Sequence, residues 1–452
     1  MPDLVPYRRV HIVGAGGSGM SGLAKLLVQC GHHVTGSDLK PGPMLAALEG
    51  AGADTWVGHQ PDVVVKADLV VASSAVPDHD PEVVAAREAG IDVWERPRLL
   101  AAITDRLRTI GVTGTHGKTT GTAMAVTALR SLGRDPTFMV GGLLIDLNTN
   151  AHMGEEDLFV LEADEAFGTF LSLSLEGLLI TNVETDHLDH YGSVDNMEDA
   201  FAEVASGVSG PVVACLDDPG ARRLAAGNEA VIGYGSGPDV RWRMTEIEHR
   251  DGGVSFSLTG DAEVNVWIPK PGLHVARNAA GVVALLSECG FESGAVAEGL
   301  RGFVGVRRRF EIRSRRGGVT LVDDYAHHPT EVAATLEAAR SGHPGRILAV
   351  FQPHRFTRTE EHGIALGRAL STADRIFVSD VYAAGEAPIP GITGRSVLDG
   401  VSDPSRVEYV PRRADLAQAV ARQVEPGDLV LLLGAGDITQ VADELAPLLP
   451  EA

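Results

Sequence analysis

Short apolar segments that run directly into glycine-rich loops are the feature that most constrains the fold of this chain. Arg9–Val13 leads into the loop Gly14–Gly19, and Thr109–Val112 leads into the loop Gly114–Thr120. A helical pattern follows each loop, and further apolar strands follow each helix. Alternating strands and helices favour parallel sheets with helices packed on their faces. The pattern therefore predicts an α/β fold.

The chain of 452 residues is long enough for about three domains. We expect domains over residues 1–106, 107–313 and 314–452, each opening on an apolar strand. Ala230–Ile268 alternates polar and apolar residues around turn signals, which predicts antiparallel strands appended to the second sheet. The third segment begins near the strand Val319–Asp323 and is expected to form another doubly wound sheet.

The charge balance restricts the partners of this chain. It has 38 basic and 61 acidic residues, a net charge of −23, which argues against a nucleic-acid partner. Three widely spaced cysteines exclude a disulfide framework and a four-cysteine zinc site. The N-terminus lacks the apolar stretch of a signal peptide, and no window approaches the roughly 18 apolar residues of a membrane helix. We therefore expect a cytoplasmic protein without a membrane partner.

The first glycine loop has the pattern of a dinucleotide-binding turn. Gly14–Gly19 matches G-x-G-x-x-G, and Asp38 ends the next strand. Such glycines let a pyrophosphate approach the N-terminus of the following helix, while the acid binds a ribose hydroxyl. NAD fits this pattern, as does any diphosphonucleoside, including a UDP-sugar. A tight turn without a ligand is the remaining alternative.

The second glycine loop predicts a triphosphate site. Gly114–Thr120 lies between a strand and a helix, so its backbone amides and Lys118 are suited to cradle phosphate oxygens. The hydroxyl of Thr119 is suited to hold Mg²⁺. Val112 stands where the strict eight-residue pattern has a glycine.

Acidic and histidine-containing clusters follow two other strands of the second segment. They are Leu161–Glu165 and Asn182–His190. Ligands of parallel sheets bind at the carboxyl ends of the strands, and both clusters occupy such ends. Either cluster alone is compatible with a solvated acidic loop. Together with the Lys118 loop they predict a site for Mg²⁺ or Mn²⁺ bridging phosphates.

Two further clusters follow strands of the third segment, Asp323–Glu331 and Phe351–Thr359. Glu331 and its neighbours suit the start of a helix. Arg355 and Arg358 share one face if this segment is helical, where they can clamp a carboxylate or form surface ion pairs.

In this order the motifs resemble those of the Mur ligase family. They are HIVGAGGSGMSGLA, GVTGTHGKTT, LEADE, TNVETDHLDHYG, VRRRFE, DDYAHHPTE, FQPHRFTRT and LLLGAGDI, and they span Arg9 to Ile438. DDYAHHPTE and FQPHRFTRT resemble the alanine-adding members and a related ligase that attaches recycled peptides. The resemblance implies an N-terminal Rossmann-like UDP-binding domain, a central P-loop-like ATPase with appended antiparallel strands, and a C-terminal Rossmann-like amino-acid-binding domain.

The resemblance implies an ATP-dependent ligase that joins L-alanine to the lactyl carboxylate of UDP-N-acetylmuramate through an acyl phosphate, in peptidoglycan precursor synthesis. Its implied cofactors are ATP and Mg²⁺ or Mn²⁺, and its implied state is a monomer or homodimer. Three alternatives stay open: the same chemistry with a peptide acceptor, a non-catalytic UDP-sugar-binding homologue, and an NAD-dependent oxidoreductase that leaves the second loop unexplained.

The resemblance also implies roles for individual residues. The ATP site falls on Gly114, Thr115, Gly117, Lys118, Thr119, Thr120, Asn278, Arg309 and Asp324. The metal ligands fall on Thr119, Glu162 and His187. The UDP end falls on Gly16, Ser18, Ser37, Asp38 and Ser73. The amino-acid site falls on His327, Arg355 and Arg358, with the arginines on the carboxylate and the histidine, as a base with a pKa near 7, beside the amine. The implied catalytic residues are Lys118, His187, Arg309 and His327.

Some positions depart from the family pattern. Val275 stands where an asparagine is frequent, which puts one adenine contact in question. Ala166 and Phe167 replace a common Ser-Asp pair, which puts substrate contacts of that loop in question. Gly121 replaces a threonine, and Ala326 replaces a glycine.

Overall fold

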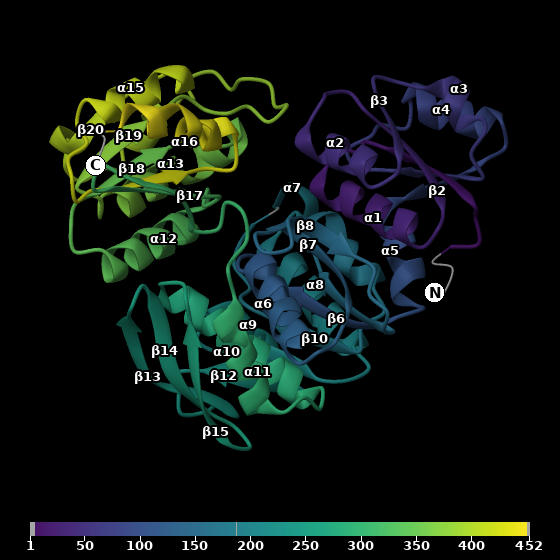
Figure 1. Ribbon diagram of the computed structural model, residues 1–452, viewed down its shortest axis with the longest axis horizontal. Coiled ribbons are helices and arrows are strands. Elements are labelled where there is room, and N and C mark those ends of the chain that lie inside the picture. The colour runs from purple at the N-terminus through teal and green to yellow at the C-terminus, as the bar shows by residue number, and fades with distance from the viewer. Residues whose placement is uncertain (1–4, 187, 450–452) are drawn as a thin grey trace. The chain divides into compact units, whose positions relative to one another are not determined.

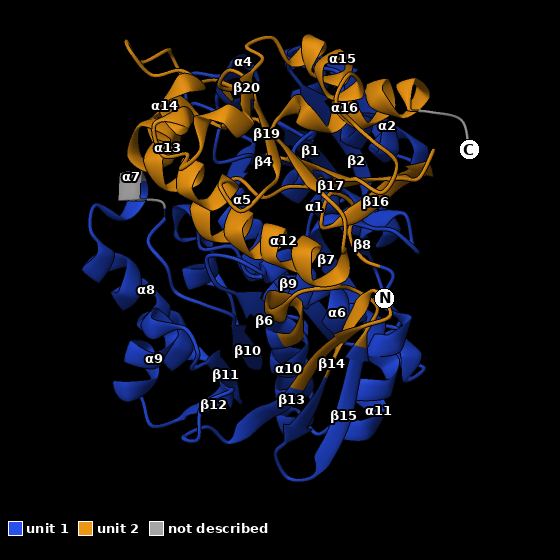
Figure 2. Cartoon of the chain, turned by 90° about the vertical axis from the view of Figure 1, so that its left-hand side faces the viewer, with its two compact units in different colours: residues 1–246, 256–267, 277–304 blue, residues 247–255, 268–276, 305–452 orange. Residues whose placement is uncertain are grey.

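The computed structural model describes residues 5–186 and 188–449. These residues form three sheets of five, ten and six strands with helices on their faces, which confirms the α/β prediction (Figure 1). The chain divides into two compact units (Figure 2). Unit 1 comprises residues 1–246, 256–267 and 277–304, and unit 2 comprises residues 247–255, 268–276 and 305–452.

The five-stranded sheet of unit 1 is parallel throughout, in the order β3-β2-β1-β4-β5. The strand order reverses beside β1, and ligands of open parallel sheets bind at such a reversal. Its strands are β1 (Arg9–Val13), β2 (His33–Asp38), β3 (Asp54–Val57), β4 (Leu69–Ala72) and β5 (Asp92–Glu95). Its helices are α1 (Ser18–Gln29), α2 (Pro43–Gly50), α3 (Pro61–Val64), α4 (Pro81–Glu88) and α5 (Arg96–Thr104).

The ten-stranded sheet has the order β15-β14-β13-β12-β11-β10-β6-β9-β7-β8. Its strands are β6 (Arg108–Thr113), β7 (Thr137–Leu144), β8 (Thr149–His152), β9 (Leu158–Glu162), β10 (Gly177–Ile180), β11 (Val212–Cys215), β12 (Val231–Gly235), β13 (Trp242–Arg250), β14 (Gly253–Thr259) and β15 (Glu263–Ile268). Its helices are α6 (Lys118–Ser131), η1 (Ala166–Ser172), α7 (Leu188–Tyr191), α8 (Val194–Gly207), α9 (Pro219–Ala226), α10 (Leu273–Glu288), α11 (Ser293–Gly299) and η2 (Leu300–Gly302).

The prediction of antiparallel strands over Ala230–Ile268 is only partly correct. β12 runs parallel to β11, and β13 pairs with β12 in parallel as well. A hairpin begins only after β13, where Asp251 and Gly252 both have positive φ, as a type I′ turn requires. The error arose because alternation of polar and apolar residues reports burial and not strand direction.

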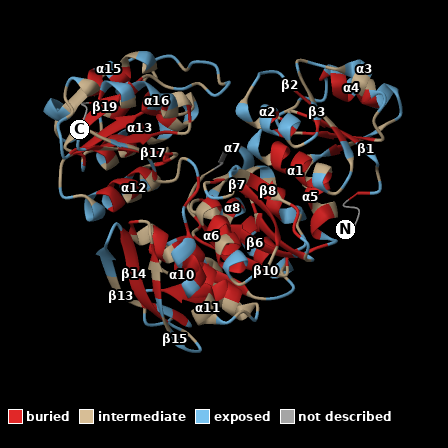
Figure 3. Ribbon diagram, in the orientation of Figure 1, coloured by how far each residue is buried: buried red, intermediate tan, exposed pale blue. Residues whose placement is uncertain are grey.

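The first two sheets share one hydrophobic core. Helix α1 packs on β7 and β8 of the ten-stranded sheet. Its Leu23 and Leu27 belong to the same buried cluster as Phe159 and Leu161 of β9. The central strands of each sheet are buried (Figure 3). Asn150 of β8 reinforces this junction, because its side chain donates to the carbonyl of Ser18 at 3.0 Å.

The six-stranded sheet of unit 2 has the order β16-β17-β21-β18-β19-β20, and only β16 is antiparallel to its neighbour. Apolar clusters cover both of its faces. The strands are β16 (Glu311–Arg316), β17 (Val319–Asp324), β18 (Ile347–Phe351), β19 (Arg375–Val378), β20 (Val407–Tyr409) and β21 (Leu429–Leu433). The helices are α12 (Pro329–Gly342), α13 (Phe356–Leu370), α14 (Arg395–Leu398), η3 (Pro404–Arg406), η4 (Arg413–Asp415), α15 (Leu416–Ala421), η5 (Asp437–Thr439), α16 (Gln440–Leu445) and η6 (Ala446–Leu448). None of the helices in the described part of the chain combines the length and the apolar run needed to span a bilayer.

Candidate active site

The first glycine loop lies at the carboxyl ends of β1, β2 and β4. Two of its amides, those of Gly14 and Ala15, donate to the carbonyl of Ser37 at 2.9 Å each. Asp38 accepts a hydrogen bond from the amide of Gly16 at 2.9 Å. Ser73 lies against the turn, since a Cβ built on Gly14 would be 3.1 Å from the Cβ of Ser73. The structure therefore gathers the predicted UDP residues at one edge of this sheet.

Ser18 begins helix α1, and Gly17 is the residue before it. Glycine has no side chain with which to cap the first amides of the helix. An uncapped helix N-terminus beside a glycine turn is suited to bind a phosphate group. The side chain of Ser37 behaves differently from the prediction, because it is 2% exposed and its hydroxyl donates to Glu82 at 2.6 Å.

The second glycine loop connects β6 to α6 and depends on two glycines with positive φ. Gly114 has a φ of 130°, and a Cβ there would lie 2.2 Å from the Thr181 hydroxyl. Gly117 has a φ of 83°, and a Cβ there would lie 2.8 Å from the side-chain oxygen of Asn278. A side chain at either position would be crowded and its backbone strained, so both positions favour glycine.

Gly117 lies against the side chain of Asn278, a residue that is distant in the sequence. Asn278 lies on α10, some 160 residues further along the chain, and is 6% exposed. The structure brings it against the P-loop-like turn, where the resemblance placed an adenine-contacting residue.

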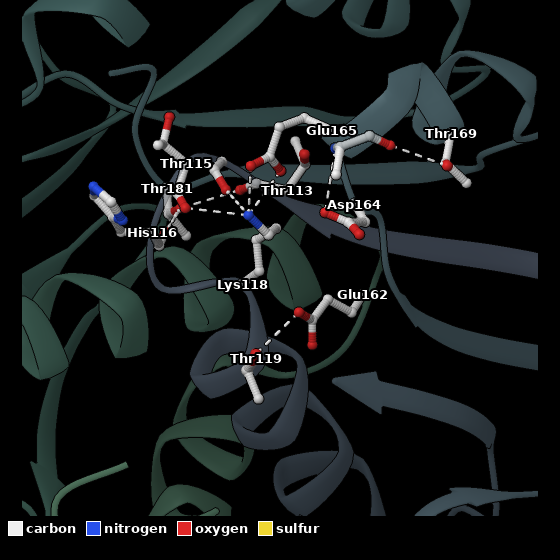
Figure 4. A network of polar contacts seen from close by, with 12 residues as sticks. Thr113, Thr115, His116, Lys118, Thr119, Glu162, Asp164, Glu165, Thr169 and Thr181 are labelled. Atoms are coloured by element: carbon white, nitrogen blue, oxygen red, sulfur yellow. Dashed lines mark hydrogen bonds and ion pairs between the residues drawn. The ribbon is translucent and has the colours of Figure 1, made fainter. Parts of the chain in front are cut away.

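Lys118 is the first residue of α6, and its ammonium group lies inside the loop. It donates to the carbonyls of Gly114 at 2.7 Å and Thr115 at 3.1 Å, and to the carboxylate of Glu165 at 2.7 Å (Figure 4). Glu165 is 2% exposed. In this structure the Lys118 ammonium group, which the sequence analysis assigned to phosphate, is therefore paired with Glu165.

The electrostatics of this pair follow from an excess of carboxylates. Burial raises the pKa of Glu165 to about 7, and nearby Asp164 adds to that effect. Burial alone would lower the pKa of Lys118, but Glu165, Asp164 and Glu162 outweigh it and raise that pKa. One ammonium group therefore faces more negative charge than it neutralises, which favours the binding of a further cation beside it.

Thr119 and Glu162 lie beside Lys118 and provide oxygen donors. The Thr119 hydroxyl donates to one carboxylate oxygen of Glu162 at 2.9 Å (Figure 4), and the amide of Gly141 donates to the other at 2.6 Å. A hydroxyl and a carboxylate are hard ligands of the kind that Mg²⁺ prefers. These two residues fit the predicted metal site. His187, the third predicted ligand, lies outside the described residues.

The segment after β10 fixes the loop from its other side. The side chain of Asn182 accepts from the amide of His116 at 2.9 Å and donates to its carbonyl at 2.9 Å. Thr115 and Glu184 exchange two further hydrogen bonds of 2.9 Å. Asn182 and Glu184 of this strand-end cluster therefore shape the phosphate loop, a role that the metal interpretation of the cluster did not include.

In unit 2, Asp324 ends β17 as a buried acid. Its carboxylate accepts from the amides of Phe310 at 2.7 Å and Ala326 at 2.8 Å. Burial raises the pKa of Asp324 to about 6, and the positive charge of Arg309 opposes that shift. The Arg309 guanidinium lies over the Tyr325 ring at 5.0 Å. Asp324 thus anchors the turn that carries Arg309, and its carboxylate is already engaged at the position implied for a ribose contact.

His327 lies in the same turn. Its Nδ1 is 3.0 Å from the carbonyl oxygen of Tyr325 and 3.3 Å from the carboxylate of Glu331. Burial, with smaller contributions from the positive charges of Arg358 and Arg309, outweighs the opposing effect of Glu331 and lowers the pKa of His327 to about 4. The expectation of a base with a pKa near 7 is therefore wrong for this arrangement. The imidazole is neutral at pH 7, but it binds a proton weakly because burial and two guanidinium groups disfavour its charge.

The two arginines of the third segment do not share one helix face. α13 begins at Phe356, and Arg355 precedes it with a φ of 70°. The Arg355 guanidinium donates to Glu386 at 2.6 Å. Arg358 is in the helix, close enough to His327 to affect its pKa. The prediction failed because a left-handed residue turns the chain directly before the helix.

Comparison with known proteins agrees with this arrangement of loops. Three family models match the chain: the Mur ligase family catalytic domain at residues 9–108, the Mur ligase middle domain at 112–286 and the Mur ligase glutamate ligase domain at 308–436. The chain belongs to the Mur ligase family. Membership confirms the resemblance noted in the sequence and the predicted fold class.

Individual Mur ligases match nearly the whole chain. Two relatives are named UDP-N-acetylmuramate–L-alanine ligase: that of Mycolicibacterium gilvum is 43% identical, covering 97% of this chain and 95% of its own, and that of Clavibacter sepedonicus is 44% identical, covering 97% and 92%. The crystal structure of the UDP-N-acetylmuramate–alanine ligase of Thermotoga maritima superposes with a TM-score of 0.85 at 28% identity, covering 97% of this chain and 98% of that one.

The residues at which this Mur ligase departs from the family pattern differ in their surroundings. Phe167 has a φ of 56° and is 62% exposed, with its ring edge toward His190 at 5.9 Å. Val275, in the first turn of α10, is buried with 5% of its surface exposed. Ala326 is buried and is absent from the positive-φ residues, so this backbone does not need a glycine.

Glu165 and Glu82 are the polar residues that sequence reasoning missed. Glu165 belongs to a cluster recognised at the end of β9, but its pairing with Lys118 depends on where two loops meet in space. Glu82 lies on α4, in a stretch without a motif. Its only sequence signal is its place in the first turn of a helix, two residues after the capping Asp80.

Proposed function

We propose that this chain is an ATP-dependent ligase that joins L-alanine to the lactyl carboxylate of UDP-N-acetylmuramate. The observation that carries the proposal is the cluster of Lys118, Thr119 and Glu162 at neighbouring strand ends of a Mur ligase. The relatives at 43% and 44% identity carry the name of this activity. Both glycine loops are then used, one for the UDP end and one for ATP.

The reaction needs ATP because a carboxylate is a poor electrophile. An oxygen of the lactyl carboxylate attacks the γ-phosphorus, the bond to the β–γ bridging oxygen breaks, and ADP leaves. The amine of alanine then attacks the carbonyl carbon of the acyl phosphate, inorganic phosphate leaves, and the amine gives up a proton. In the first step, two anions approach each other, so cations must neutralise the charge between them.

Lys118 supplies one of these cations from within the chain. Its ammonium group moves from Glu165 and the loop carbonyls to the β- and γ-phosphate oxygens when ATP binds. The glycine loop contributes amides at fixed positions, which lose little freedom on binding. Thr119 and Glu162 would hold Mg²⁺, which when bound adds positive charge beside the phosphates, and we keep His187 as a proposed further ligand.

The remaining residues are proposed to bind the other substrates. Gly16, Ser18, Asp38 and Ser73 lie around the first loop and are assigned to the UDP end. Arg309, Asp324, His327, Arg355 and Arg358 cluster in unit 2 at the ends of β17 and β18, and are assigned to ATP and alanine. The arginines suit the alanine carboxylate, and the neutral His327 suits an acceptor of one amine hydrogen. Because the reaction consumes ATP, we place the enzyme in the cytoplasm.

The test follows phosphate release from ATP and Mg²⁺ in the presence of UDP-N-acetylmuramate and one amino acid at a time. We expect release with L-alanine, and slower release with glycine and L-serine. A single methylene-sized difference in a pocket changes discrimination by about 10–200-fold. No release with any of the three amino acids would overturn the proposal, and release only with a preformed peptide would favour the peptide-adding activity.

A further inference from the structure

A buried carboxylate lies behind the first glycine loop. Glu82 of α4 is 1% exposed. One of its oxygens accepts from the hydroxyl of Ser37 at 2.6 Å, the other accepts from the amide of Gln60 at 2.8 Å, and Nε2 of His11 lies 3.4 Å away. Burial pushes the pKa of Glu82 upward, but the interactions with His11, Ser37 and Gln60 outweigh it and hold that pKa below its ordinary value. Glu82 is therefore an ionised, fully engaged group in the interior.

Ser37 connects this carboxylate to the glycine loop. Its hydroxyl donates to Glu82, while its carbonyl accepts from the amides of Gly14 and Ala15. The next residue, Asp38, accepts from the amide of Gly16. Three consecutive amides of the loop are thus oriented by two adjacent residues at the end of β2. Of these two residues, Ser37 has its side chain held in place by its hydrogen bond to Glu82.

The other contacts of Glu82 reach different elements. His11 lies on β1, three residues before Gly14, and its Nδ1 is 2.8 Å from the Thr35 hydroxyl of β2. Gln60 directly precedes α3. One carboxylate therefore links two adjacent strands to the start of a third element. A buried ion with this many partners is costly to rearrange, so it fixes the geometry of what it touches.

A histidine and an aspartate lie at the outer edge of the same cluster. Nδ1 of His59 is 3.5 Å from Asp80 and 3.9 Å from Glu82. The donor atoms of these three residues lie within 4.8 Å of one another. Hydrogen bonds from Ser37 and Gln60 already occupy both oxygens of Glu82, which favours an anchor for the loop over a metal ligand.

We propose that Glu82 is a positioning residue for the UDP end of the sugar substrate, acting through Ser37 on the amides of Gly14 and Ala15. This inference rests on the proposed function, which assigns that loop to UDP. It also gives Ser37 an indirect role in place of the direct contact predicted from the sequence. Phosphate oxygens are bound by amides whose direction is set before binding, so a loop that loses its anchor binds the diphosphate more weakly.

The experiment compares the full-length wild type with Glu82→Gln, Ser37→Ala and the double variant. UDP binding is measured by calorimetry, and KM for each substrate, kcat and Tm are measured alongside. Glu88→Gln is the matched control, because it makes the same chemical change at an exposed position of the same helix. We expect each single variant to raise the Kd of UDP and the KM of the UDP-sugar about tenfold, which corresponds to one buried hydrogen bond to a charged group.

The effects should be specific and coupled. KM for ATP and kcat should change less than twofold, and the double variant should bind UDP no more weakly than the weaker single variant. Unchanged UDP binding in Ser37→Ala would overturn the inference even if Glu82→Gln does not fold. The inference would also be overturned if the single variants lost all kinetic constants equally and had a lowered Tm. It would likewise be overturned if the effects of the two substitutions on UDP binding were fully additive in the double variant. Failure of the wild type to release phosphate would instead count against the proposed function, since UDP binding is measured without turnover.

Discussion

The two glycine loops of unit 1 are built alike and equipped differently. Each follows a buried parallel strand and ends at a glycine that directly precedes a helix, Gly17 before α1 and Gly117 before α6. The first loop is hydrogen-bonded to the end of the neighbouring strand β2, and the second to the segment that follows the neighbouring strand β10. The backbone alone therefore makes both loops suitable for phosphate groups.

The difference lies in the side chains that each loop adds. The first loop contains no cation of its own, although the Arg96 guanidinium lies beside Gly19, and its polar neighbours Ser37 and Asp38 hold its own amides. The second loop adds Lys118 and Thr119, which contact Glu165 and Glu162. A glycine turn by itself binds a diphosphate, whereas a turn with a cation and metal-binding oxygens can also promote chemistry on it. The backbone of a glycine turn is therefore sufficient to bind phosphate, and the side chains around the turn decide whether it can also promote a reaction.

The strongest test of this difference removes the cation. Lys118→Ala should lower kcat by about 10²–10³-fold, the usual loss when one group that stabilises transition-state charge is deleted. UDP binding should stay within twofold, because the hydrogen bonds of this side chain to the described residues go to Gly114, Thr115 and Glu165 and not to the first loop. Phosphate release and calorimetry with UDP measure the two effects, with the exposed Lys66→Ala as control. Retained turnover would mean that the two loops differ less than their side chains indicate.

A second test compares the backbones of the two turns. Gly114→Ala should lower the free energy of unfolding by about 2–4 kcal/mol, since the methyl group would meet Thr181 and φ is left-handed. Gly14→Ala should cost less, because its neighbour Ser73 is 3.1 Å away. Gly133→Ala, at a φ of 75° with open space around it, is the control and should cost about 1 kcal/mol. Urea denaturation measures all three, and equal losses at Gly114 and Gly133 would contradict the expected crowding.

A third test addresses the proposed metal ligands of the second loop. Glu162→Gln should raise the Mg²⁺ concentration that gives half-maximal rate by about tenfold, because a neutral amide binds a divalent cation less well than a carboxylate. Glu155→Gln makes the same change at an exposed position and should leave that concentration unchanged. Titration of the rate with Mg²⁺ is the measurement. An unchanged midpoint would remove Glu162 from the site.

The smallest expected effect concerns the internal partner of Lys118. Glu165→Gln should tighten the binding of ADP by about two- to tenfold, or ~0.4–1.4 kcal/mol, because the nucleotide no longer competes with a carboxylate for the ammonium group. In a Lys118→Ala background the same substitution should have no effect. Calorimetric titration of the four proteins gives this cycle. Weaker binding in Glu165→Gln would show that the pair orients the lysine and does not compete for it.

Much of the fold could be predicted because each strand, glycine turn and helix is recognisable from a short contiguous stretch of sequence. Gly114 and Gly117 are required where a side chain would collide, so the loop is visible in the sequence. The direction of β12 and β13 was not visible, since alternation is the same for parallel and antiparallel strands.

The candidate site was predictable to the same extent. Lys118, Thr119 and Glu162 come together as their positions at strand ends indicated. The low pKa of His327 could not be foreseen, because it depends on burial by distant segments. The left-handed conformation of Arg355 was equally hidden, because no glycine marks it.

The apolar junction between α1 and the strands β7 and β8 has a consequence for dissecting this enzyme. Met139, Phe159 and Leu161 belong to the same buried cluster as Leu23 and Leu27 of the first helix. A truncated protein that begins at the second glycine loop would lack α1 and expose this apolar surface to water. We expect such a protein to aggregate on expression. A chimera that takes the first sheet and its helices from a relative should accordingly fold only when the residues of β7, β8 and β9 that pack against α1 are exchanged as well.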